Sequence, residues 1–150
     1  MDIVDNRSFI NKEDEKTIEN ELKLAERVES KWGAEFKKMH STYALDFAII
    51  KNGKIKAWAE CKTRYHKYGT FFTYMMSLKK YRACRDYTIK TGLKSFFLVA
   101  YEDGDWFIDT RTIAQNIKKF TINIGGTEKR GLGIDYEPMI FVPLFLFKKL

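Results

Sequence analysis

Two carboxylates and a lysine lie at a spacing that could support metal-dependent chemistry on a phosphodiester. Glu60 and Lys62 flank Cys61 at the end of an apolar stretch typical of a strand, so their side chains point to the same face. Asp46 lies on the preceding apolar stretch, across a short hairpin, and can reach the same place. These side chains outline a metal-binding cleavage site.

Hydrolysis of a phosphodiester requires a nucleophilic water and compensation of the negative charge that develops on the phosphorus and the leaving oxygen. A divalent cation supplies both, and carboxylate oxygens suit the hard ions Mg²⁺ and Mn²⁺. We therefore expect Asp46 and Glu60 to be ligands, with the backbone carbonyl of Cys61 as a further oxygen donor. Lys62 would stabilise the deprotonated water or the charge on phosphorus. The Cys61 side chain points to the opposite face and is expected to pack.

A shared metal site makes a demand on the register of the two strands. A two-residue turn at Asn52-Gly53 would place Asp46 opposite Ala59. In that register the Asp46 side chain points away from Glu60, whereas a loop one residue longer sets the two carboxylates directly across from each other. The chemistry therefore predicts a three-residue loop, a bulge or a strong twist between these strands. An undistorted two-residue hairpin would contradict the shared site.

A solvated charge pair on an exposed strand face is the alternative interpretation of Glu60 and Lys62. The flanking residues argue against it, because both strands are too apolar for a face that meets water. A buried carboxylate pair is costly unless a cation compensates it. The apolar neighbours are Leu45, Phe47, Ile49 and Ile50 beside Asp46, and Ala57, Trp58, Ala59 and Cys61 around Glu60.

The elements that would position these groups follow from periodicity and turn signals. Apolar residues recur every three to four positions between Lys12 and Trp32, which predicts a helix that Gly33 ends. Residues 1–11 are expected to be a polar lead-in. Three strands are predicted at 34–40, 43–50 and 55–62, and Asn52-Gly53 is the turn signal between the last two.

The second half of the chain is expected to add a helix, further strands and surface connections. Ser77 is a candidate cap for a helix from Leu78 to Thr91 that Gly92 ends. Its inner stripe would leave Lys79, Lys80, Arg82 and Lys90 largely outside. Strands are predicted at 94–101, 106–109 and 139–142, a polar and aromatic connection at 63–74, a helical turn after Thr112, and a Gly-rich surface turn at 125–133. We expect residues 1–150 to form one domain.

Composition bounds the class of protein and suggests a polyanionic partner. The 150 residues are 45% hydrophobic and 15% aromatic, which excludes a disordered chain. The net charge is +7, but residues 1–30 hold nine acidic and five basic side chains while 31–150 hold eleven acidic and twenty-two basic ones. A basic body favours nucleic acid. Without a membrane-length apolar run or close cysteine spacing, we expect a cytoplasmic protein with reduced Cys61 and Cys84.

These motifs together resemble the PD-(D/E)XK nuclease superfamily. The motif is Leu45-Asp46, thirteen intervening residues, and Glu60-Cys61-Lys62, with Leu45 in place of the proline, which is not a ligand. The resemblance covers residues 20–101 and is strongest to small resolvase-like and phage-encoded members. It implies an α/β fold with a restriction-endonuclease-like core, in which a mixed central sheet is flanked by helices in the order αβββαβ.

The resolvase-like pattern also implies a glutamate from the first helix. In that pattern the glutamate is followed by apolar residues three, four and seven positions on, which favours Glu21 as a catalytic and metal-binding residue. Glu19 and Glu26 share a helix stripe and remain alternatives, as does the interpretation that these residues, together with Glu29, are surface charge.

Basic and aromatic residues beyond the motif are candidates for contacts with nucleic acid. Rings can stack on unpaired bases while lysine and arginine neutralise phosphates. Each group has a plain alternative as a polar loop or solvated helix face. The candidates are Arg64, Tyr65, Lys67 and Tyr68 after the motif, Lys79, Lys80 and Arg82 on the second helix, and Lys129 and Arg130 in the Gly-rich segment.

The function expected from this pattern is a Mg²⁺-dependent (or Mn²⁺-dependent) endonuclease acting on DNA in phage or mobile-element recombination, repair or DNA processing. Selection by DNA structure is favoured over a recognition sequence. The chain would work in the cytoplasm, that of the host if it is phage-encoded, and as a homodimer if residues 141–147 form an interface rather than close the core. A non-catalytic nucleic-acid-binding module and a ribonuclease are the alternatives.

Overall fold

The computed structural model describes residues 3–40, 42–129 and 133–150, without the side chains of residues 3–14, 126–129 and 133–136. Its first element is a long helix, α1 (Ile3–Trp32), which begins before the expected start at Lys12 because no glycine or proline interrupts residues 3–11. Gly33 ends the helix with φ of 60°, and its N–H donates to the carbonyl of Glu29 at 2.9 Å.

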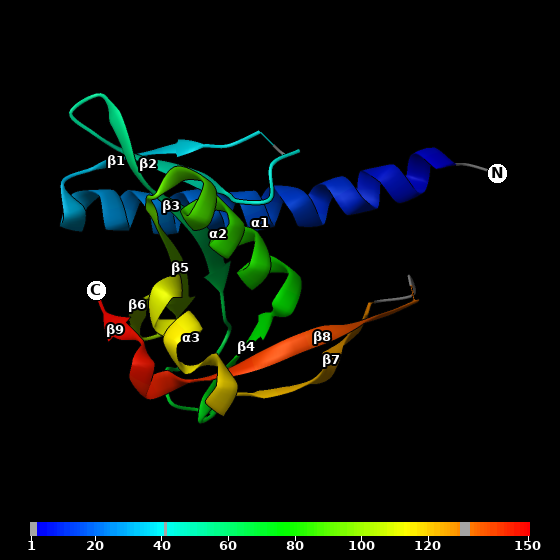
Figure 1. Ribbon diagram of the computed structural model, residues 1–150. Coiled ribbons are helices and arrows are strands. Elements are labelled where there is room, and N and C mark those ends of the chain that lie inside the picture. The colour runs from blue at the N-terminus through cyan, green and yellow to red at the C-terminus, as the bar shows by residue number, and fades with distance from the viewer. Residues whose placement is uncertain (1–2, 41, 130–132) are drawn as a thin grey trace.

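The central sheet is mixed, as the fold-class prediction requires. Its strand order is β1 (Glu35–Lys38), β2 (Phe47–Lys51), β3 (Lys54–Thr63), β5 (Lys94–Tyr101), β6 (Gly104–Asp109) and β9 (Lys148–Lys149). Only the β3–β5 pair is parallel among these neighbours. α1 covers one face, and α2 (Leu78–Thr91) and α3 (Thr110–Asn116) lie on the other (Figure 1). The expected αβββαβ order holds, with one additional strand before α2.

Each face of the sheet has its own apolar core. Leu24, Ala25 and Val28 of α1 are buried against the face that includes Cys61. Trp58 belongs to the opposite core, together with Cys84 of α2. Because side chains alternate along a strand, Glu60 and Lys62 share the face of Trp58. The motif carboxylate and lysine therefore face the α2 side, and the intervening thiol is packed under α1, as predicted.

The β2–β3 hairpin contains the distortion that the chemistry demands. The turn has two residues, Asn52 with φ of 54° and Gly53 with φ of 73°, the left-handed pair of a type I′ turn. The register then shifts between Ile49 and Ile50, because Lys56 of β3 has no partner on β2. A bulge of this kind adds one residue to one strand. The predicted irregularity is therefore confirmed, and it is a bulge.

Helix α2 begins and ends where its local signals predict. The Ser77 hydroxyl accepts the backbone N–H of Lys80, and Gly92, at φ of 71°, donates its N–H to the carbonyl of Thr88. Tyr81, Cys84 and Thr88 form its buried stripe. Lys79, Arg82 and Lys90 are exposed, as expected, whereas Lys80 is half-buried.

A second sheet, which the sequence analysis missed, packs on the α2 side. It has the order β4 (Thr73–Ser77), β8 (Gly133–Pro143) and β7 (Thr121–Lys129). Residues 125–129 of the expected Gly-rich surface turn are therefore part of β7, and 130–132 lie outside the described residues. A Cβ on Gly125 would come within 2.9 Å of Met139 Cγ and 3.0 Å of Met75 Sδ. The absence of a side chain at this position therefore leaves room for the two methionine side chains.

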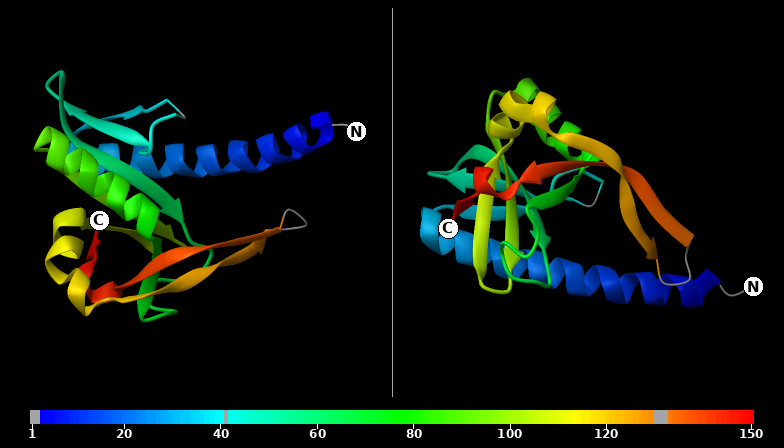
Figure 2. Two further views of the ribbon diagram at one scale, coloured as in Figure 1. Left: turned by 45° about the vertical axis from the view of Figure 1, so that its right-hand side comes forward. Right: turned by 90° about the horizontal axis from the view of Figure 1, so that it is seen from below.

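Two projections extend past the central sheet toward the same side of the molecule, the N-terminal part of α1 and the β7–β8 hairpin (Figure 2). Short 3₁₀ helices at Ile117–Lys119 and Leu144–Leu146 join the remaining elements. Within the described ranges, no helix has the length and apolar character needed to cross a membrane.

Candidate active site

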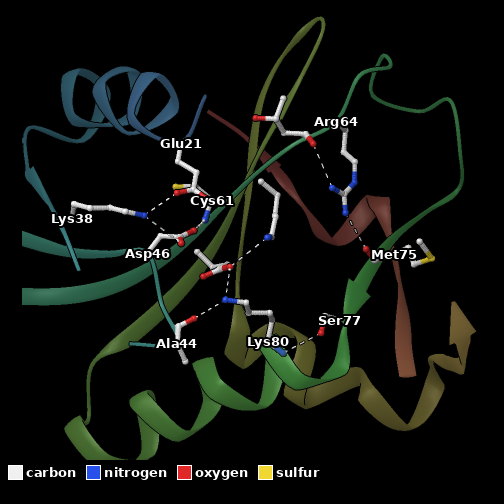
Figure 3. A network of polar contacts seen from close by, with 12 residues as sticks. Glu21, Lys38, Ala44, Asp46, Cys61, Arg64, Met75, Ser77 and Lys80 are labelled. Atoms are coloured by element: carbon white, nitrogen blue, oxygen red, sulfur yellow. Dashed lines mark hydrogen bonds and ion pairs between the residues drawn. The ribbon is translucent and has the colours of Figure 1, made fainter. Parts of the chain in front are cut away.

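The bulge brings Asp46 and Glu60 to the same place at the end of β2. Beyond the bulge, Phe47 pairs with Ala59, so the next step in the register sets Asp46 across from Glu60. The Asp46 carboxylate accepts the backbone N–H of Cys61 at 2.9 Å (Figure 3). This bond fixes the carboxylate beside β3. Because the N–H and C=O of one strand residue point to the same side, the carbonyl of Cys61 also points toward Asp46.

Glu60 is a buried carboxylate held beside two ammonium groups. Its residue is 0% exposed, and its Oε1 lies 3.2 Å from Lys80 Nζ and 3.7 Å from Lys62 Nζ. Neither carboxylate oxygen has a hydrogen-bond partner of suitable geometry among the described residues. Burial, and then repulsion from Asp46, raises the pKa of Glu60 from 4.5 to about 7, against the pull of Lys80 and Lys62.

Lys80 is a site residue whose role at the carboxylate the sequence analysis missed. Its Nζ donates to the carbonyl of Ala44 at 2.9 Å in addition to its contact with Glu60 (Figure 3). The Ser77 cap starts α2 so that Lys80 lies in its first turn, directed at the sheet. Its spacing could have revealed this, because Cys84 lies four positions on, along the buried stripe.

Glu21 joins the site from α1 through a second missed lysine. Lys38 Nζ of β1 donates to Glu21 Oε2 at 2.8 Å and lies 3.6 Å from Asp46 Oδ1 (Figure 3). Burial raises the pKa of Glu21, and the hydrogen bond from Lys38 counteracts this. Glu21 is 8% exposed, whereas Glu19 and Glu26 are exposed. Of the three candidates, only Glu21 reaches Asp46 through a lysine in this structure.

The fit of a divalent cation can be judged from these groups. Within the described part of the chain, no group of three or more His, Cys, Asp and Glu side chains is arranged to hold a metal ion. Asp46 and Glu60 nevertheless present hard oxygen donors, and the oxygens of Glu60 are buried without hydrogen-bond partners. A cation would compensate that burial. The two carboxylates with the Cys61 carbonyl fit a hard cation, while Glu21 is occupied by Lys38.

A pocket of about 760 Å³ opens beside this cluster, between β3, α2 and the second sheet. Lys62 and Lys80 line it together with Arg64 and Lys79. Because Lys62 and Lys80 also contact Glu60, the pocket is adjacent to the acidic cluster. Its floor is mostly apolar and includes Met75, Met76, Phe97 and Met139.

The expected nucleic-acid contacts divide into those that face this pocket and those that do not. Arg64 is held by bonds to the carbonyls of Thr63 and Met75 and lies 4.6 Å from the Tyr74 ring centre. Tyr68 is instead part of the packing: its ring stacks on Trp106 at 4.1 Å and its hydroxyl donates to the carbonyl of Leu144 at 2.7 Å. Tyr68 thus has a structural role, and its expected contact with a base stays a prediction.

Three of the remaining candidates, Tyr65, Lys67 and Arg82, are exposed and do not line the pocket. Tyr65 is 69% exposed and accepts a bond from Asn20 on α1. Lys129 ends β7 with its side chain not described, and Arg130 lies outside the described residues.

Comparison with known proteins agrees with this geometry. A family model described as "Phage putative PDDEXK endonuclease" matches residues 11–150. Among solved structures, that of Hjc, a Holliday junction resolvase from the archaeal hyperthermophile Archaeoglobus fulgidus, matches with a TM-score of 0.58 at 13% identity. The match covers 90% of this chain and 92% of that one, which shows a shared fold. No curated protein matches the chain.

Proposed function

Since the chain belongs to this phage PDDEXK endonuclease family, we propose that it is a metal-dependent endonuclease that hydrolyses DNA phosphodiester bonds. The observation that carries the proposal is the bulged hairpin, which sets Asp46 across from Glu60 with Lys62 on the Glu60 face. A structural hairpin has no need to set a half-buried carboxylate, Asp46, beside a buried one, Glu60, because their mutual repulsion and desolvation are unfavourable.

The proposed metal site uses Asp46, Glu60 and the carbonyl of Cys61. A bound Mg²⁺ or Mn²⁺ would supply a nucleophilic water at neutral pH and compensate charge on the phosphoryl group. We assign Glu21 to the same set because it is buried close to Asp46, on the condition that Lys38, which bridges the two carboxylates, releases Glu21 when the cation binds. The bond from the Cys61 N–H orients Asp46, so that one of its oxygens is fixed before substrate arrives.

The lysines have distinct proposed roles around the scissile phosphate. Lys62 lies 3.7 Å from Glu60 and also lines the pocket, so its ammonium can face the attacked phosphate and stabilise charge that develops there. Lys80, tied to the Ala44 carbonyl, positions the Glu60 carboxylate. Lys79 and Arg64 on the pocket wall would contact flanking phosphates.

The proposed substrate is DNA selected by its structure rather than by a recognition sequence. The basic charge outside α1 and the cationic pocket wall support a polyanionic substrate. The solved structure of like fold is a Holliday junction resolvase by its title, which makes branched DNA the first substrate to test. We further propose one nuclease domain, a homodimer as the working unit, and a role in phage recombination, repair or DNA processing in the host cytoplasm.

Cleavage assays with matched variants test this function. Supercoiled, linear, single-stranded and four-way-branched DNA, and RNA, are incubated with Mg²⁺, Mn²⁺ or EDTA. The wild type should cut DNA only with a metal, and Asp46→Asn, Glu60→Gln and Lys62→Met should each reduce cleavage at least a hundredfold. Glu19→Gln and Lys90→Met, both at exposed positions, are the controls.

Folding and DNA affinity are measured for the same variants. Retained folding and salt-dependent binding would assign the loss to the chemistry. Binding without cleavage of any substrate, in either metal, would favour a non-catalytic nucleic-acid-binding module instead. Cleavage confined to RNA would favour a ribonuclease.

A further inference from the structure

The pocket beside the acidic cluster has a cationic part and an apolar part, and a DNA backbone alone would need only the cationic part. Lys62 and Lys80 form the wall nearest Glu60, with their ammonium groups 3.7 and 3.2 Å from its carboxylate. The floor is apolar and rich in methionine. A phosphate-sugar chain is matched by cationic and polar groups, whereas an apolar floor suits a flat, weakly hydrated group.

The methionine floor is a built feature of the second sheet. Met75 of β4 and Met139 of β8 converge over Gly125 of β7, where a Cβ would meet both side chains at about 3 Å. Only glycine at this position lets the two methionines lie where they do without displacement. Methionine side chains adapt to planar ligands because they are unbranched and polarizable.

One acidic residue on the pocket wall argues against a second phosphate as the occupant. Glu137 of β8 is half-buried and lines the pocket together with the lysines and the methionines. Its carboxylate would repel a phosphate deep in the pocket, whereas it can accept an N–H from the edge of a base. The lining thus offers ammonium groups to a phosphate and a carboxylate to the hydrogen-bond donors of a base.

We infer that this pocket receives the base of one unpaired or extruded nucleotide next to the phosphate that is cut. The inference rests on the proposed function and adds the substrate feature that the site selects. A base within an intact duplex is stacked and paired and is not free to enter a pocket, whereas an unpaired base enters at a much smaller cost. The volume of about 760 Å³ is within the range of sites that hold one small ligand.

The test compares three DNA duplexes of the same sequence: fully paired, with one unpaired nucleotide, and with that unpaired nucleotide lacking its base. Equilibrium binding is measured by fluorescence anisotropy in EDTA, so that the readout does not depend on cleavage. The wild type should bind the duplex with the unpaired nucleotide about tenfold more tightly than the paired one, at the low end of what one stacked base contributes. Removal of the base should abolish most of that preference.

Two variants on α2 localise the effect. Ala83→Phe fills the pocket from a half-buried position that lines it, and Ile89→Phe places the same ring at a position that is 70% exposed. Ala83→Phe should reduce the preference to less than about threefold, and Ile89→Phe should leave it unchanged.

An equal affinity for the base-containing and the base-free bulge would overturn the inference, and so would a preference that survives Ala83→Phe in a folded protein. The base-free duplex keeps the test valid if Ala83→Phe does not fold. Failure of the proposed function has a different signature, which is the absence of metal-dependent cleavage of every DNA substrate.

Discussion

The buried carboxylate of Glu60 should make the stability of the protein depend on pH in a defined direction. Its pKa is raised from 4.5 to about 7, first by burial and then by Asp46. The folded protein therefore binds this proton more tightly than the unfolded chain. Consequently, the contribution of Glu60 to the free energy of unfolding falls as the pH rises from 4.5 to 7, and the full cost is present above about pH 7.

The magnitude follows from the difference between the two pKa values. One pKa unit corresponds to about 1.4 kcal/mol, so ionisation of Glu60 costs roughly 3 kcal/mol of stability at pH 8. Glu60→Gln keeps the shape of the side chain but cannot ionise. We expect the variant and the wild type to have similar stability near pH 4. At pH 8 the variant should be more stable by roughly 3 kcal/mol, a rise in Tm of about 10 °C for a domain of this size.

Urea unfolding in EDTA, repeated between pH 4 and pH 8.5, measures this difference. Glu19→Gln is the control, because Glu19 is exposed and pairs with Lys23 at 3.0 Å. Its stability difference from the wild type should stay below about 0.5 kcal/mol at every pH. Two results would refute the raised pKa of Glu60. One is a stability difference between Glu60→Gln and the wild type that does not change with pH, and the other is a wild type more stable than the variant at pH 8. Mg²⁺ at pH 8 should stabilise the wild type and not Glu60→Gln.

Two further changes test the hairpin and the packing of the loop after the motif. Deletion of Lys56 removes the bulge residue but preserves the pairs on both sides, so cleavage should persist, whereas an alanine inserted after Ala57 should abolish it by shifting Glu60 out of register. Loss of cleavage in a folded Lys56 deletion would contradict the register argument. Tyr68→Phe should lower the free energy of unfolding by about 1 kcal/mol through loss of its bond to Leu144, without changing DNA affinity. A DNA affinity of Tyr68→Phe severalfold weaker than that of the wild type would support Tyr68 as a DNA contact.

Local signals and chemical demand account for what could be predicted from the sequence. Ser77 and Gly92 determine the ends of α2 by hydrogen bonds within a few residues, and both ends are as expected. The need for Asp46 to face Glu60 predicted an irregular hairpin, because the undistorted two-residue hairpin would pair Asp46 with Ala59 and turn the two carboxylates to opposite faces. Glu21 was selected by a helical pattern, and its apolar partners at three, four and seven positions are the buried face of α1.

Long-range pairing explains what the sequence did not reveal. β4 is a five-residue strand whose hydrogen-bond partner, β8, comes more than fifty residues later in the chain. The alternating burial of β4 is not visible in the sequence, because Tyr74, Met75 and Met76 are consecutive apolar residues. Lys38 and Lys80 likewise contact carboxylates on other elements. The apolar floor of the pocket depends on this second sheet, so it could not be recognised before the sheet was known.

The shared lysines determine which variants can separate catalysis from recognition. Lys62 and Lys80 contact the Glu60 carboxylate and also line the pocket, so a substitution at either changes the electrostatics of the cluster and the binding of the substrate together. A loss of activity in such a variant therefore has two causes that kinetics alone does not divide. Asp46 and Ala83 avoid this difficulty. Asp46 contacts Lys38 and the Cys61 N–H and does not line the pocket, and Ala83 has no charge, so the pair isolates the proposed chemistry from the proposed selection of an unpaired base.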